Sequence, residues 1–84
     1  MKIDAPISVI SLYDAQRHAL TPKKLQWKGR EYFITQFGYH HKVRIGKTLM
    51  HIFTVATDTL CFKLRLDTDT LDWILEEVYE ASAS

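Results

Sequence analysis

The chain has one cysteine, no long apolar run and no secretory-signal pattern, and each absence narrows the class of protein. With Cys61 as its single cysteine, the chain cannot form an internal disulfide, which fits a reducing compartment. No stretch approaches the ~20 apolar residues of a membrane-spanning helix. The first residues also lack the apolar core of a secretory signal. We therefore expect a cytoplasmic protein that does not associate with membranes.

Signatures of catalysis and metal binding are missing as well. The chain contains no G-x-S-x-G, P-loop or G-x-G-x-x-G motif. His40, His41, His51 and Cys61 carry metal-ligand atoms, but their spacing matches no zinc signature. Cys61 stands beside Phe62 with no basic neighbour that would activate the thiol. We expect no enzyme, no catalytic residue, no metal and no cofactor.

The composition is that of a small folded domain. The chain has 84 residues, of which 46% are hydrophobic and 25% are charged, ordinary values for a globular protein. No repeat, linker or low-complexity tract divides it. We expect residues 1–84 to form one domain with a modest core.

Charge is unevenly distributed, although the net charge is only +1. Residues 17–47, the basic segment, carry eight lysines and arginines against the single acid Glu31, so their net charge is about +7. Residues 48–84 carry two bases and seven acids, which gives about −5. The basic segment could face phosphates and the acidic residues a basic partner. Alternatively, the two parts neutralise each other within the fold.

A β-hairpin is the most specific local prediction. In "KKLQWKGREYFITQFGY", a two-residue turn at Lys28-Gly29 suits the positive φ that glycine tolerates. This turn places Trp27 opposite Arg30, Leu25 opposite Tyr32 and Gln26 opposite Glu31. We expect Trp27 and Tyr32 to pack in the core, with Arg30 over the Trp27 ring; the alternative is that these rings stack on bases.

Other segments are assigned from periodicity and turn residues. Residues 6–14, 49–57 and 60–67 are rich in β-branched, aromatic or alternating apolar residues and predict strands. Thr21-Pro22 indicates a loop, and so do the polar and basic residues 38–48, which have glycines near both ends. The fold expected from these segments is a small, mostly β protein, an antiparallel sheet or partly open barrel of five to six strands.

The C-terminal segment is ambiguous between helix and strand. Its apolar residues fit the helical template i, i+3, i+4, i+7, i+8, which favours a helix over residues 69–81 in an α+β fold. A helix, however, would leave Trp73 on its acidic face, where the lost burial costs roughly 1.5–3 kcal/mol. Periodicity alone favours the helix, and the position of Trp73 favours a strand.

Four segments resemble landmarks of a small bacterial family of unknown function. They are "WKGREYFI" from Trp27, "HIFTV" from His51, "FKLRLDTDTLDW" from Phe62 and "WILEEVYE" from Trp73. The family is typified by a W-x-G-R-x-Y hairpin and a terminal W-x-L-x-x-V-Y stretch. It is similar to the C-terminal accessory region of catalytically inactive Y-family polymerase homologues. The resemblance implies an antiparallel β domain whose last two strands form a hairpin through residues 67–70, and it implies no catalytic residues. We therefore predict a strand at the C-terminus.

Two hypotheses for function follow. We expect a non-enzymatic small binding or adaptor module, and in the first hypothesis it contacts single-stranded nucleic acid through residues 23–47. The candidate contacts are Lys28, Arg30, Lys42, Arg44 and Lys47. The alternative is a protein–protein module or homodimer that uses an exposed edge strand, residues 7–12 or 73–79. The first hypothesis predicts that the cations converge beside an open aromatic ring. The second predicts dispersed cations and an exposed apolar edge.

Overall fold

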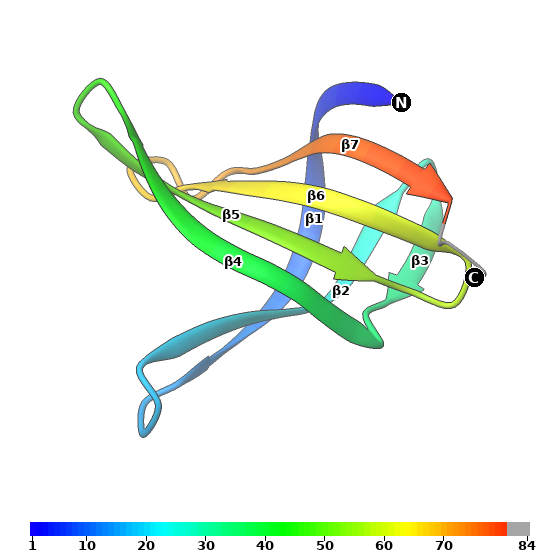
Figure 1. Cartoon of the computed structure of the whole chain (residues 1–84), viewed down its shortest axis with the longest axis horizontal. Coiled ribbons are helices and arrows are strands. Elements are labelled where there is room, and N and C mark those ends of the chain that lie inside the picture. The colour runs from blue at the N-terminus through cyan, green and yellow to red at the C-terminus, as the bar shows by residue number, and fades with distance from the viewer. Residues whose placement is uncertain (81–84) are drawn as a thin grey trace.

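The structure is a computed structural model that describes residues 1–80, and its regular elements are strands (Figure 1). They are β1 (Lys2–Asp14), β2 (Ala19–Trp27), β3 (Arg30–Phe33), β4 (Gln36–Ile45), β5 (Thr48–Ala56), β6 (Leu60–Asp67) and β7 (Trp73–Glu80). Residues 1–80 form one antiparallel sheet in the order β3-β2-β1-β7-β6-β5-β4, which does not close because β3 and β4 do not pair. The prediction of a mostly β fold is confirmed, with seven strands instead of five or six.

Strand β1 connects two layers of the molecule. Its first half pairs with β7 as far as Ile7, and its second half, from Ser8 onward, pairs with β2. The layer of β2 and β3 packs on the face of β6, because the rings of Trp27 and Tyr32 lie 6.2 and 5.1 Å from the ring of Phe62. We call the side of each strand that points between the layers its inner face and the opposite side its outer face.

The core lies between these layers and is built from apolar side chains of β2, β5, β6 and β7. Along β6, alternate residues point inward, as the period of two predicts, while Lys63 and Arg65 point outward. The buried core residues are Leu25, Phe53, Val55, Phe62, Leu64, Leu66, Trp73, Leu75 and Val78.

The predicted β2–β3 hairpin is confirmed pair by pair. Trp27 lies opposite Arg30, Leu25 opposite Tyr32, and Gln26 opposite Glu31. The turn residues Lys28 and Gly29 have φ angles of 53° and 74°. Positive φ at both central residues belongs to the type I′ turn, whose twist matches that of the flanking strands. Local turn chemistry therefore determines the register of this hairpin.

The loop predicted at residues 38–48 is wrong, because this segment forms most of β4 and its turn to β5. The two strands pair from Gln36 opposite Ala56 to Ile45 opposite Thr48. A bulge lies at Gly38, where an added Cβ would sit 3.3 Å from the carbonyl oxygen of Thr54. Polar side chains are compatible with this strand because it is the edge of the sheet and all its residues are exposed.

The loop predicted at Thr21-Pro22 is also wrong, since both residues lie inside β2. Pro22 pairs with Ser11 beyond the last β2–β3 pair, which joins Lys24 and Phe33. Strand β3 therefore does not extend alongside Pro22. On the β3 side of β2 no strand needs the N–H group that proline lacks, so proline is tolerated there.

The C-terminal segment is strand β7, so the alternative of a helix over residues 69–81 is wrong for its described part; residue 81 lies outside the described residues. Trp73 is buried in the core. A bulge between β6 and β7 inserts Glu76, so the buried positions are Trp73, Leu75 and then Val78. The step of three across the bulge reproduces part of a helical period, which explains the ambiguity of the sequence.

No segment among residues 1–80 is a helix with the length and apolar character needed to cross a membrane.

Candidate nucleic-acid interface

The five predicted contact residues fall into two groups at opposite ends of β5. Arg30 lines a hollow together with residues 57–59, just beyond the end of β5, and Lys28 is in the adjacent turn. Lys42, Arg44 and Lys47 belong to the β4–β5 hairpin near the start of β5. Nine residues of extended strand, about 30 Å, separate these two ends. The structure therefore does not bring all five cations together.

At the β2–β3 turn, the aromatic residues pack as predicted, but a different cation covers Trp27. The Nζ atom of Lys28 lies 5.0 Å from the Trp27 ring centroid, the position predicted for Arg30. Trp27 and Tyr32 are partly buried against the core. Neither ring is an open stacking platform. The exposed ring in this region is that of Phe33, which lines the hollow with Arg30 together with the acids Glu31 and Asp58.

Strand β4 carries a row of functional side chains on its inner face. His40 pairs with Phe53, Lys42 with His51, and Arg44 with Leu49. Directly opposed residues share a face and side chains alternate along a strand, so His40, Lys42 and Arg44 form one row on the side of Phe53. The chain carries no acid between Glu31 and Asp58, so the row is purely cationic and aromatic.

A groove of about 460 Å³ lies beside this row, between β2 and β4, and we call it the β2–β4 groove. In Figure 1 the tips of the β1–β2 and β4–β5 hairpins both project to the left of the view. The groove is lined by Arg17, Ala19, Leu20, Thr21, Lys23, Phe37, Gly38, Tyr39, His40 and Phe53. Phe37 and Tyr39 are open to solvent, with 49% and 62% of their surface exposed. The groove thus combines two cations, open aromatic rings and no carboxylate.

His40, which lines the groove, forms a pair with His51 on the neighbouring strand. The Nε2 atom of His40 and the Nδ1 atom of His51 are 2.8 Å apart, a hydrogen bond in which one ring donates and the other accepts. The His40 ring stacks on Phe53 with centroids 4.3 Å apart and an interplanar angle of 2°. Partial burial lowers the pKa of both imidazoles, and the charge of Lys42 lowers it further. Both rings are therefore neutral at pH 7.

The lowered pKa values make stability dependent on pH. A histidine whose pKa is lower in the folded state binds fewer protons there than in the unfolded chain. Its contribution to stability is present above the unfolded pKa of 6.5 and is lost as the pH falls through the folded pKa. We expect the urea midpoint to fall less between pH 7.5 and 5.5 in His40→Gln than in the wild type. His18→Gln, at the tip of the β1–β2 hairpin, should retain the wild-type change; equal changes in all three proteins would contradict the prediction.

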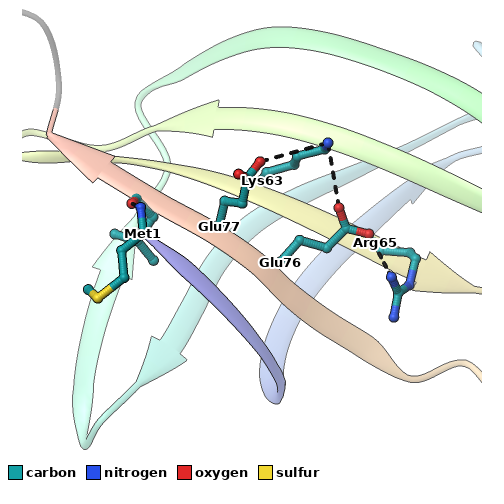
Figure 2. A network of polar contacts seen from close by, with 6 residues as sticks. Met1, Lys63, Arg65, Glu76 and Glu77 are labelled. Carbon is teal, nitrogen blue, oxygen red and sulfur yellow. Dashed lines mark hydrogen bonds and ion pairs between the residues drawn. The ribbon is translucent and has the colours of Figure 1, made fainter.

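None of the ion pairs among residues 1–80 joins the basic segment, residues 17–47, to an acid of residues 48–80. Glu76 contacts both Arg65, at 2.7 Å, and Lys63, at 3.6 Å, and Glu77 contacts Lys63 at 3.8 Å (Figure 2). These pairs lie within the acidic part on the outer face. In the basic segment, Arg17 pairs with Asp14 and Lys24 pairs with Glu31.

The mutual neutralisation considered from the sequence is therefore not observed in the described chain. Six cations of the basic segment have no carboxylate within ion-pair distance among residues 1–80: Lys23, Lys28, Arg30, Lys42, Arg44 and Lys47. Three of them, Lys23, Lys42 and Arg44, lie in or beside the β2–β4 groove. The positive charge of this groove is thus available to a ligand.

The potential metal ligands do not gather into a larger cluster. In the described part of the chain, no group of three or more histidine, cysteine, aspartate or glutamate side chains is placed to hold a metal ion. His40 and His51 form a pair, and Cys61 is a partly exposed free thiol on β6.

Several residues of the groove were not predicted from the sequence. Arg17, Phe37, Phe53 and His40 were not predicted as contacts, although each lines the groove. The usable signal was the alternation of His40, Lys42 and Arg44, which becomes visible only when residues 36–45 are assigned to a strand.

The chain matches no protein-family model, no curated protein and no solved structure. The resemblance to the accessory region of inactive Y-family polymerase homologues therefore stays a prediction.

Proposed function

We propose that this protein is a non-enzymatic module that binds single-stranded nucleic acid in the β2–β4 groove. The observation that carries the proposal is the combination of open aromatic rings with cations that have no acidic partner. Lys23 lines the groove, and Lys42 and Arg44 continue the row of His40 along β4. Positive grooves with aromatic side chains are the usual means of binding single strands without sequence preference.

The two kinds of side chain have separate roles in this proposal. Lys23, Lys42 and Arg44 neutralise phosphates, which supplies affinity and makes it dependent on salt. Phe37, which pairs with Val55 and so shares the face of His40, stacks on a base, a contact worth about 1–3 kcal/mol. A single strand exposes the faces of its bases, whereas a duplex covers them by stacking. The exposed rings of the groove therefore favour single strands over duplexes.

The test is a titration of labelled oligonucleotides with the protein, followed by fluorescence anisotropy. Single-stranded DNA, single-stranded RNA and duplex DNA of the same sequence are each titrated at about 50 and 200 mM salt, a range over which multi-phosphate binding weakens steeply. We expect binding to both single strands at low salt, weaker binding to the duplex, and a clear loss at high salt. The RNA and DNA arms identify the preferred sugar.

A matched pair of phenylalanine variants distinguishes the groove from other surfaces. Phe37→Ala should weaken single-strand binding by roughly 5- to 150-fold, the equivalent of one stacked base. Phe33→Ala removes the same group from the outer face, where Lys24 lies over the ring at 5.5 Å, and should bind like the wild type. No binding at low salt, or equal loss in both variants, would overturn the proposed function.

A further inference from the structure

In the β1–β2 hairpin, one backbone edge of β1 is free of pairing among residues 1–80. Pairing with β7 ends at Ile7, so within the described part of the chain residues 8–14 have β2 as their only strand partner. Their backbone groups on the other side are available to another strand. An isolated two-stranded hairpin is marginally stable in water. A partner strand would therefore stabilise this arm.

This edge lacks two of the usual protections against pairing, charge and proline, although a bulge in its pairing with β2 falls between Ile10 and Ser11. Natural edge strands carry charges, prolines or short lengths that discourage association. Residues 8–13, "SVISLY", contain no charge and no proline. Ile10 and Leu12 are 57% and 54% exposed, and Tyr13 is exposed on the opposite face. The other long edge, β4, has His40, His41, Lys42 and Arg44, whose charges and polarity oppose pairing with a copy of itself.

We propose that the free edge of β1 pairs antiparallel with the same edge of a second copy, forming a two-fold symmetric dimer. Full overlap of residues 8–14 places the symmetry axis at Ser11. Ile10 then lies opposite the partner's Leu12 on the outer face, and Val9 lies opposite the partner's Tyr13 on the inner face. Each apolar side chain meets an apolar one, and no like charges face each other.

The occupant is a second copy because the sequence of this edge is complementary to itself about Ser11. A symmetric dimer requires the same patch on both subunits, with residue i contacting j and j contacting i. The pairs of residues 10 with 12 and 9 with 13 meet this condition. Asp14, the first charge along the edge, falls opposite the partner's Ser8. The inference does not depend on nucleic-acid binding, because the edge lies outside the row on β4.

The first test measures mass by sedimentation equilibrium, using protein freed of nucleic acid. We expect the wild type to approach twice the monomer mass at concentrations up to about 1 mM, where even a small interface is populated. Ile10→Lys with Leu12→Lys places like charges opposite each other and should be monomeric. Ile10→Lys with Leu12→Glu places opposite charges across the same pairs and should restore the dimer. A monomeric wild type, a dimer that survives both lysines, or open-ended assemblies would overturn the proposal.

The second test is disulfide trapping in a Cys61→Ser background. Opposed Cα atoms in antiparallel strands are about 4.5–5.5 Å apart, within the range of a disulfide. Ser11→Cys should therefore give a covalent dimer under mild oxidation. In the proposed register two copies of position 8 lie about 20 Å apart, so Ser8→Cys should stay monomeric. Equal trapping at both positions, or none at position 11, would contradict the register.

Discussion

Replacing Phe62 with alanine is expected to lower the free energy of unfolding by about 3–5 kcal/mol. The side chain is fully buried, with 0% of its surface exposed, and it meets Trp27 and Tyr32 of the opposite layer. Its removal leaves a cavity where the two layers meet. Domains of this kind are stable by about 5–15 kcal/mol in total, and small ones lie at the low end of that range. Urea unfolding should show a large fall in the midpoint or a protein that is largely unfolded in buffer.

Phe33→Ala is the control for this prediction. It deletes the same aromatic ring, but 66% of the Phe33 surface is exposed on the outer face of β3. We expect a change of at most about 0.5 kcal/mol, as for most surface substitutions. A loss at Phe33 equal to the loss at Phe62 would show that the core does not lie between the layers as described.

The parts of the fold that could be predicted are those determined by local chemistry. The Lys28-Gly29 turn accepts positive φ at both residues and so determines every pair of the β2–β3 hairpin. The alternation along β6 reflects burial of one face beneath the layer of β2 and β3. In both cases the information lies within a few residues of the chain.

The parts that could not be predicted depend on contacts distant in sequence. Strand β4 has no buried side chain, so the short alternation of Lys42 and Arg44 with Val43 and Ile45 marks no buried face, and the polar composition of the segment favoured a loop. It is a strand because it pairs with β5 across the turn. In β7, the bulge at Glu76 breaks the alternation of buried and exposed residues, so the strand is recognisable only from its pairing with β6. The burial of Trp73, which conflicted with a helix, was the more reliable indicator.

The position of the edges could not be deduced either. Residues 73–79 were predicted as an edge, but β7 lies between β1 and β6 in the middle of the sheet, so that prediction is wrong. Residues 7–12 belong to β1, which is also internal in strand order. It has a free edge only because its second half extends beyond the last pair with β7, Ile7 with Trp73. Strand order depends on the way in which a long strand such as β1 passes from one layer to the other.

The cations of the basic segment were counted correctly, but their number did not reveal their grouping. The predicted set treated Lys28 and Arg30 as equivalent to Lys42 and Arg44. The structure places the two pairs at opposite ends of β5, and only the second pair continues the row of His40. The two pairs therefore provide a matched comparison, with the same residue types and the same charge in different surroundings.

Reversing the charge of Lys42 and Arg44 is expected to abolish single-strand binding. Lys42→Glu with Arg44→Glu changes the charge beside the groove by four units and replaces two phosphate contacts with repulsion. Each lost phosphate contact lowers the slope of log K against log salt by about 0.7 on a single strand, so any residual binding should show a slope reduced by about 1.4. Anisotropy titrations over several salt concentrations measure both the affinity and the slope.

Lys28→Glu with Arg30→Glu makes the same change in net charge at the far end of β5. If the β2–β4 groove is the binding site, this variant should lose only the weak, long-range part of the attraction. Lys42 pairs with His51, about 20 Å along β5 from Thr57, and this separation exceeds the Debye length of about 10 Å at 0.1 M salt. Its salt slope should therefore match that of the wild type. Equal losses in the two double variants would mean that binding follows net charge and that the groove has no special role. A larger loss at Lys28 and Arg30 would move the interface to the β2–β3 turn, where Trp27 and Tyr32 are packed against the core and the exposed ring is that of Phe33.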